Sequence, residues 1–199
     1  MSGEEERRAR DLMVEGSALL RRVRKGELSQ RALELLGALD HAPALEALGS
    51  HAPEEEPDLK RWVRNLDAFG PQVSARIVVI CARLLLPVLE RDGIAHREAL
   101  AAIDLAETWL RCPCDEHARD AQRVHNETIA AGMRTQSDSA ETAVLVAAFA
   151  ALVASMPTPA MDVAADAADV AGEDKVRRAV RAELVPWALG ASAGEAPRS

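Results

Sequence analysis

The sequence predicts an all-α fold, an irregular stack of antiparallel helical hairpins with about nine or ten helices. Two observations predict it. Apolar residues recur at helical spacing along most of the 199 residues, and no segment alternates apolar and polar residues long enough to form a convincing strand. Aromatic residues make up only 3% of the chain, with no tyrosine, whereas β-sandwiches and barrels use aromatic and β-branched residues freely.

Three helical segments are expected before residue 50. The helix over residues 4–25 begins with glutamates and ends with arginines, a polarity that suits the helix dipole. Ser29 is a good N-cap for a second helix that runs to about Asp40. A short helix over residues 41–48 follows and is closed by Gly49. Residues 1–49 are therefore a candidate N-terminal helical lobe, joined to the rest by a linker over 50–57 in which two prolines bracket three glutamates.

The next segments are expected to form the centre of the domain. An amphipathic helix ending near Gly70 is predicted by four apolar residues at spacings of three and four, Leu59, Trp62, Val63 and Leu66. Pro71 then suits the first turn of a helix that reaches about Glu90 and is apolar on most sides, which indicates a buried position. Pro87 is expected to kink this helix or to end it early.

Further helices complete a single domain over residues 1–189, followed by a small, polar tail at 190–199 that we expect to fray. The helix over 95–110 should turn Leu100, Ile103 and Trp109 inward, and residues 111–115 break the pattern. The remaining helices are expected at about 115–133, 138–155, 158–170 and 173–188.

Composition excludes several classes of function. The net charge of −8 and the scarcity of aromatic rings argue against a nucleic-acid partner. The first residues lack a secretory signal, and the longest nearly apolar stretch, Ala143 to Met156, is too short for a bilayer span of about 20 residues, so no membrane partner is expected. Three cysteines form no disulfide framework, which favours a cytoplasmic location.

Cys112, Cys114 and His117 form the most distinctive local motif, with two thiols and an imidazole within six residues. Thiolate and imidazole are the ligands that zinc prefers, so these residues are candidate metal ligands or, for the two thiols, a redox pair. The spacing argues against this interpretation, because zinc sites usually separate their paired cysteines by two to four residues, whereas one residue separates Cys112 from Cys114. The competing interpretation is a plain helix-to-helix turn broken by Pro113.

No catalytic constellation stands out, and we expect neither enzymatic activity nor a cofactor. Nucleophile elbows, glycine-rich phosphate loops and H-E-x-x-H zinc motifs do not occur in the sequence. Cys81 lies in the most apolar segment, where a cysteine is usually an inert core residue. Arg76 and Arg83, seven residues apart on the same helix face, could anchor an anion, but structural ion pairs are the favoured interpretation.

A surface for a protein partner is predicted near the C-terminus. Asp162, Asp166 and Asp169 fall at i, i+4 and i+7 and so share one helix face, which could dock a basic partner. The competing interpretation is a solvated face, since three arginines follow at 177, 178 and 181. Trp187 comes near the end of the last helix and is the tryptophan most expected to be partly exposed, as an interface anchor would be.

Several segments resemble helical proteins of myxobacteria that have no assigned function. These segments are GELSQRALELLGALDHAPALEALG (26–49), DLKRWVRNLDAFG (58–70), ARLLLPVLE (82–90) and AIDLAETWLRCPC (102–114), within a match over roughly residues 20–118. The alanine-rich helices from Arg76 to Ala151 also resemble immunity proteins of bacterial polymorphic-toxin systems. The resemblance implies an all-helical fold without assigned catalytic residues.

Together these features favour a non-catalytic protein-interaction module, either an immunity-type inhibitor or an adaptor that binds a protein partner. The alternative is a metal- or redox-responsive helical sensor that uses Cys112, Cys114 and His117.

Overall fold

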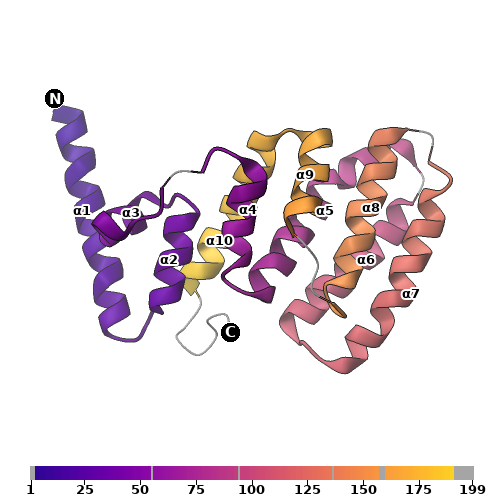
Figure 1. The fold of residues 1–199 in the computed structure, drawn as a ribbon, viewed down its shortest axis with the longest axis horizontal. Coiled ribbons are helices and arrows are strands. Elements are labelled where there is room, and N and C mark those ends of the chain that lie inside the picture. The colour runs from indigo at the N-terminus through magenta and orange to yellow at the C-terminus, as the bar shows by residue number, and fades with distance from the viewer. Residues whose placement is uncertain (1–2, 55, 94, 136, 157–159, 191–199) are drawn as a thin grey trace.

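The computed structural model describes residues 3–54, 56–93, 95–135, 137–156 and 160–190, and over these residues the fold is all-α, as predicted. This part of the chain contains ten α-helices, one short 3₁₀ turn at Gly49–His51 and no strand (Figure 1). The helices are α1 (Gly3–Arg24), α2 (Gln30–Ala38), α3 (Ala42–Leu48), α4 (Leu59–Asp67), α5 (Pro71–Asp92), α6 (His96–Arg111), α7 (Asp115–Gly132), α8 (Asp138–Leu152), α9 (Ala160–Ala171) and α10 (Glu173–Gly190).

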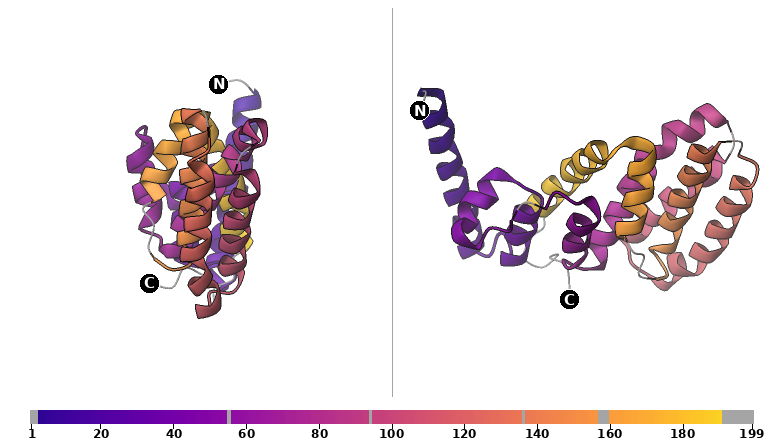
Figure 2. Two further views of the ribbon diagram at one scale, coloured as in Figure 1. Left: turned by 90° about the vertical axis from the view of Figure 1, so that its right-hand side faces the viewer. Right: turned by 45° about the horizontal axis from the view of Figure 1, so that its top comes forward.

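The helices form an elongated stack with α5 at its centre. Helices α1 to α3 lie at one end and α6 to α8 at the other (Figures 1 and 2). Helix α5 packs against α4, α6, α8, α9 and α10. Helix α10 runs back along the stack and reaches α2, so the end of the described chain ties the first helices to the middle of the molecule (Figure 2).

The local signals in the sequence produce the helix ends that they predict. The Ser29 hydroxyl accepts a hydrogen bond from the Ala32 N–H at 3.0 Å and caps α2. The Asp58 carboxylate caps α4 in the same way through the Arg61 N–H, at 2.8 Å. All four apolar residues that predicted α4 are buried, which fixes the face that this helix turns to the core.

Alanine dominates the core at the α7–α8 end of the stack. Every buried residue of α8 is an alanine, a valine or Leu152, and its sequence is apolar nearly all round. Gly132 at the end of α7 lies so close to α8 that an added Cβ would fall 3.1 Å from the Val144 Cβ and closer still to Cγ1. Small side chains therefore allow α7 and α8 to approach closely.

The structure decides one open alternative of the sequence-based prediction and corrects one residue. Helix α5 reaches Asp92, close to the predicted end at Glu90, so Pro87 does not end it early; Pro87 lies on an exposed side, and the core face of the helix continues through Leu85 and Leu89. Leu100 is not turned inward; it is 36% exposed. The buried face of α6 is centred instead on Ile103 and on small residues at helical spacing, Ala99, Ala102 and Ala106.

Among the described residues, α5 alone is long and apolar enough to cross a membrane by length and composition. Within the protein, 56% of its most apolar stretch is buried. The core helix of a globular domain passes the same test, so this feature does not assign α5 to a membrane.

The N-terminal helices are attached through polar contacts as well as through the core. The Trp62 Nε1–H donates to the Ala38 carbonyl at 2.9 Å, and Arg31 donates to the Ala68 carbonyl at 2.8 Å. Arg181 of α10 pairs with Asp40, which holds a left-handed backbone with φ of 57° just after α2. The predicted tail lies outside the described residues, except for Gly190 at the end of α10.

Candidate functional site

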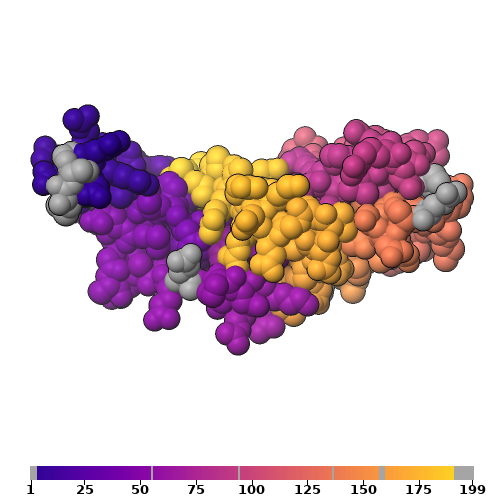
Figure 3. All heavy atoms as spheres, turned by 90° about the horizontal axis from the view of Figure 1, so that it is seen from above, coloured from indigo at the N-terminus to yellow at the C-terminus, as the bar shows by residue number. Residues whose placement is uncertain are grey.

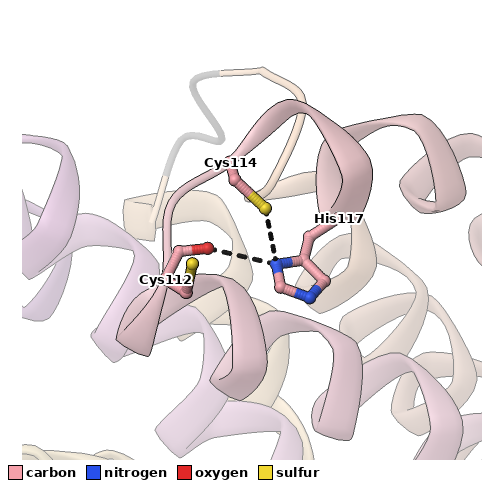
Figure 4. Close-up of side chains that lie close together, drawn as sticks. All are labelled: Cys112, Cys114 and His117. Carbon is pink, nitrogen blue, oxygen red and sulfur yellow. Dashed lines mark hydrogen bonds between the residues drawn. The ribbon is translucent and has the colours of Figure 1, made fainter.

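The structure brings Cys112, Cys114 and His117 together at the turn between α6 and α7 (Figure 4). Cys112 ends α6, Cys114 is the N-cap residue of α7, and His117 lies in the first turn of α7. One ligand atom from each of the three side chains lies within 4.8 Å of the other two. Cys112 is exposed, and Cys114 and His117 are half-buried, so the cluster is open to solvent on one side.

The two thiols lie close together because residues i and i+2 of a near-extended backbone point to the same side of the chain. Cys114 has an extended backbone (φ −133°, ψ 159°), Cys112 is close to extended (φ −141°, ψ 84°), and α7 begins immediately after Cys114. The close approach of Sγ atoms and imidazole is compatible with zinc, which takes bonds of about 2.3 Å to sulfur and about 2.0 Å to nitrogen.

The His117 Nδ1 atom has two neighbours. It lies 3.2 Å from the Cys114 Sγ and 3.1 Å from the Cys112 carbonyl oxygen (Figure 4). With a proton on Nδ1, the ring donates to the Cys112 carbonyl and caps the end of α6. Without that proton, Nδ1 is free to bind a metal beside the Cys114 sulfur, so the tautomer decides between a structural and a ligand role.

The pKa of Cys112 is raised above that of an ordinary thiol. The hydrogen bond with Cys114 is the largest cause, followed by the charge of Cys114, partial desolvation and the charge of Glu116. A metal would have to displace the Cys112 proton, which makes binding at this cluster dependent on pH. His125, two helical turns from His117, does not join the cluster; its Nδ1 lies 3.0 Å from the Ala148 carbonyl oxygen of α8.

The three predicted acidic residues form one row on α9. Asp162 and Asp169 are exposed and Asp166 is half-buried. Lys60 of α4 lies 4.0 Å from Asp162. Burial raises the pKa of Asp166 first, the charges of Asp169 and Asp162 raise it further, and Lys60 lowers it. The row therefore carries mutual repulsion that Lys60 relieves only in part.

Two of the three arginines that follow the row in sequence are used elsewhere. The Arg177 and Arg181 guanidinium carbons lie 4.9 Å and 5.5 Å from the centre of the Trp62 ring. Arg177 also donates to the Pro57 carbonyl and Arg181 pairs with Asp40. These two side chains thus point toward α4 and α2. They neutralise the acidic row of α9 less than the sequence alone suggested.

Trp187 is half-buried and packs against the core. The Arg76 guanidinium carbon lies 4.5 Å from the centre of its ring, so a charged side chain covers one face of the indole. Trp187 lies on α10, which packs against both α5 and α9, and it is partly exposed, as expected. Arg76 covers part of the ring that a partner would otherwise reach.

A cavity lies beside Arg76, the residue that covers Trp187. The sequence does not predict this cavity, although it places Arg76 and Arg83 on one helix face, where they could anchor an anion. The cavity lies between α5, α6 and α10 and has a volume of about 210 Å³. Arg83 forms the structural ion pairs that the sequence favoured, with Glu107 and Glu183. Only the spacing of the two arginines pointed to this cavity, because the third helix that closes it comes about 100 residues later in the chain.

Comparison with protein-family models, with curated proteins and with solved structures finds no match to this chain. The resemblance to immunity proteins therefore stays an expectation from the sequence, and the arguments for function come from the structure's own residues.

Proposed function

We propose that the protein is a non-catalytic interaction module, an immunity-type inhibitor or an adaptor, whose α9 face docks a basic protein partner in the cytoplasm. The arrangement of charge along α9 carries the proposal. Asp162, Asp166 and Asp169 repel one another, while Arg177 and Arg181 are held against Trp62. A partner that brings lysine or arginine to this row relieves the repulsion and gains favourable electrostatic energy on association.

The position of α9 suits such a role. Helix α9 packs on α4, α5, α8 and α10, so the row is held in place by four neighbouring helices. Seen from above, α9 and the start of α10 occupy the middle of one face of the molecule (Figure 3). A rigid helix in the centre of an elongated face presents its charges in a fixed order, which favours a specific partner over a diffuse one.

The test is a charge reversal in which Asp162, Asp166 and Asp169 are all changed to lysine. Tagged wild-type and variant proteins are used to capture partners from lysate of the source cells, and the captured proteins are identified by mass spectrometry. We expect a stoichiometric basic partner that binds the wild type, binds more weakly as salt rises and is lost by the variant. The melting temperature should change little, because two of the three side chains are exposed.

The matched control is the same change of charge at Glu4, Glu5 and Glu6, three exposed residues of the first turn of α1. This variant should retain the partner. Equal binding by the α9 variant, or equal loss with the α1 variant, would contradict the docking role of the row.

A second function, a metal- or redox-responsive sensor, is favoured by the convergence of Cys112, Cys114 and His117. Three soft ligand atoms within 4.8 Å leave a fourth tetrahedral position for water or a further ligand. The bound metal would tie the end of α6 to the start of α7. A redox response would instead join the two sulfurs, which are already hydrogen-bonded neighbours, by exchange with an external disulfide that takes up the two protons and two electrons and leaves as two thiols.

Elemental analysis of protein purified without chelator tests the metal function. It should find one zinc per chain in the wild type, and less than a tenth of that in Cys114→Ser and His117→Ala. Cys81→Ala is the control, since burial raises the pKa of Cys81 to about 12 and keeps it out of any metal site. Substoichiometric zinc in the wild type would end this proposal, and titration of free thiols after mild oxidation then decides the redox variant.

A further inference from the structure

The cavity between α5, α6 and α10 combines an apolar wall with charged groups at its edge. Its apolar lining comes from Val79, Ile80, Leu110 and Leu184. Three arginines and two glutamates complete it. The volume of about 210 Å³ lies below the range of about 300–1,000 Å³ that drug-sized ligands occupy, so the cavity suits a smaller molecule.

Arg83 binds both carboxylates of the cavity lining. The Arg83 Nε–H donates to Glu107 Oε1 at 2.7 Å, and a second guanidinium nitrogen of Arg83 donates to Glu183 Oε2 at 3.0 Å. The charges of Glu107 and Glu183 are thus directed to Arg83, which links α6 and α10 across α5. The two other arginines of the lining, Arg76 and Arg111, have to find their counter-charge elsewhere.

Arg76 is held in place without a carboxylate of its own. Its guanidinium carbon lies 4.5 Å from the centre of the Trp187 ring. Among the atoms that the structure describes, its Nε is buried and has no hydrogen-bond partner. Burial lowers the pKa of Arg76, and the charge of Glu183, already bound by Arg83, only partly opposes this. Arg76 lines the cavity with its guanidinium fixed against the Trp187 ring, and such a positioned group of N–H donors is a site for an anion.

We propose that this cavity binds a small organic monocarboxylate, with the carboxylate on Arg76 and Arg111 and the apolar body of the ligand against Ile80 and Leu184. The site uses no residue of the α9 row and none of the three side chains of the Cys112 cluster, although Arg111 directly precedes Cys112, so carboxylate binding is tested separately from both proposed functions. Arg111 is the exposed second cation, bound here only to the Thr108 hydroxyl at 3.3 Å within the described residues, and is free to turn toward the ligand.

The balance of charge favours a carboxylate over a phosphate. Three arginines and two glutamates leave the lining with one excess positive charge, which matches a monoanion. A dianion of similar size would meet the Glu107 and Glu183 charges at the same edge and would lack an apolar group for the opposite wall. The planar carboxylate also fits the fork of a guanidinium through two parallel hydrogen bonds.

Titration of the full-length protein with hexanoate and with benzoate, followed by calorimetry, tests the proposal. Hexanamide and benzamide, which have the same shape without the charge, and inorganic phosphate are the comparison ligands. We expect saturable binding of at least one carboxylate and at least tenfold weaker binding of its amide and of phosphate. In protein labelled with ¹⁵N, the Arg76 Nε–H and Trp187 indole N–H resonances should shift with the same saturation curve.

Arg177→Gln is the matched control for Arg76→Gln. Arg177 makes the same kind of contact, with its guanidinium carbon 4.9 Å from the Trp62 ring, but lines none of this cavity. Arg76→Gln should weaken carboxylate binding at least about tenfold and Arg177→Gln should leave it unchanged. Absence of saturable carboxylate binding to the wild type, equal binding of amide or phosphate, or binding that survives Arg76→Gln in a folded variant would each overturn the proposal.

Discussion

At the scale of single residues, the structure contains polar groups whose environment sets a dependence on pH. His41 precedes α3 as its N-cap residue but makes no capping hydrogen bond with its side chain. Its Nδ1 is buried without a partner within the described part of the chain. Burial lowers the pKa of His41 below 6.5, and the charge of Glu15 opposes this only in part. The protonated form is therefore disfavoured in the folded state.

The consequence is a loss of stability in mild acid. The unfolded chain binds a proton at position 41 more readily than the folded chain, so the free energy of unfolding falls as the pH drops through about 6.5 toward the lower pKa of the folded state. His41→Asn removes this term and supplies a capping oxygen, for a gain of about 1 kcal/mol at neutral pH that grows in acid. Urea unfolding of both proteins between about pH 5 and 8 measures the difference. His51→Asn, at an exposed histidine, is the control; parallel curves for His41→Asn and wild type would contradict the prediction.

The same scale shows what a sequence can reveal about a site. Cys112, Cys114 and His117 were found in advance because six residues of one turn contain all three. The anion cavity was not, because Arg76, Leu110 and Leu184 come from three helices and only tertiary packing joins them. The side-chain rotamer of Arg181 likewise decides whether this arginine neutralises the acidic row of α9 or stacks on Trp62. The periodicity of the sequence gives no information about rotamers.

At the scale of helices, the closeness of α7 and α8 depends on a missing side chain. Gly132→Ala would raise helix propensity, yet its methyl group would overlap the Val144 side chain. We expect a net destabilisation of about 1–3 kcal/mol, because the packed core resists the added volume. Chemical unfolding measures it. Val144→Ala removes the Cγ1 and Cγ2 atoms and leaves only the tight 3.1 Å contact with Cβ, so the cost of Gly132→Ala should fall in that background; an equal cost in both backgrounds would show that the two side chains do not compete.

Helix positions were predictable because start and stop signals in the sequence mark where helices begin and end. Ser29, Gly49 and Pro71 mark starts and ends that the structure places within a few residues. Pro87 does not end α5 early, because a proline can be accommodated where its side of the helix is exposed. The prediction that Leu100 is buried is wrong because alanine, not leucine, marks the buried face of α6. A small residue such as alanine gives only a weak apolar signal in the sequence.

At the scale of the whole molecule, the stack was predicted but its closing contact was not. Local patterns show which face of each helix is buried, yet not that α10 returns to α2. One end of the stack is left with little support, since residues 4–11 of α1 are all exposed, while Gly16 and Leu19 are buried farther along the helix.

Deleting residues 1–11 should therefore change the free energy of unfolding by less than about 0.5 kcal/mol. Deleting residues 1–24 should cost several times more, because it removes Leu19 and the close contact of Gly16 with Pro43 and Ala47. Thermal and urea unfolding of the two truncated proteins measures the contrast, and hydrogen exchange should be fastest at residues 4–11. A large loss from the shorter deletion would contradict this assignment.

The three tryptophans have a consequence for spectroscopy. The chain has no tyrosine, so its near-ultraviolet emission comes almost wholly from three indoles. Trp62 hydrogen-bonds the end of α2, Trp109 lines a hollow with Pro71 and Val153, and Trp187 lies under Arg76. Each indole thus reports on a different junction of the stack. In variants that keep one tryptophan each, the fluorescence of the remaining indole would report on one helix junction at a time, with no attached dye.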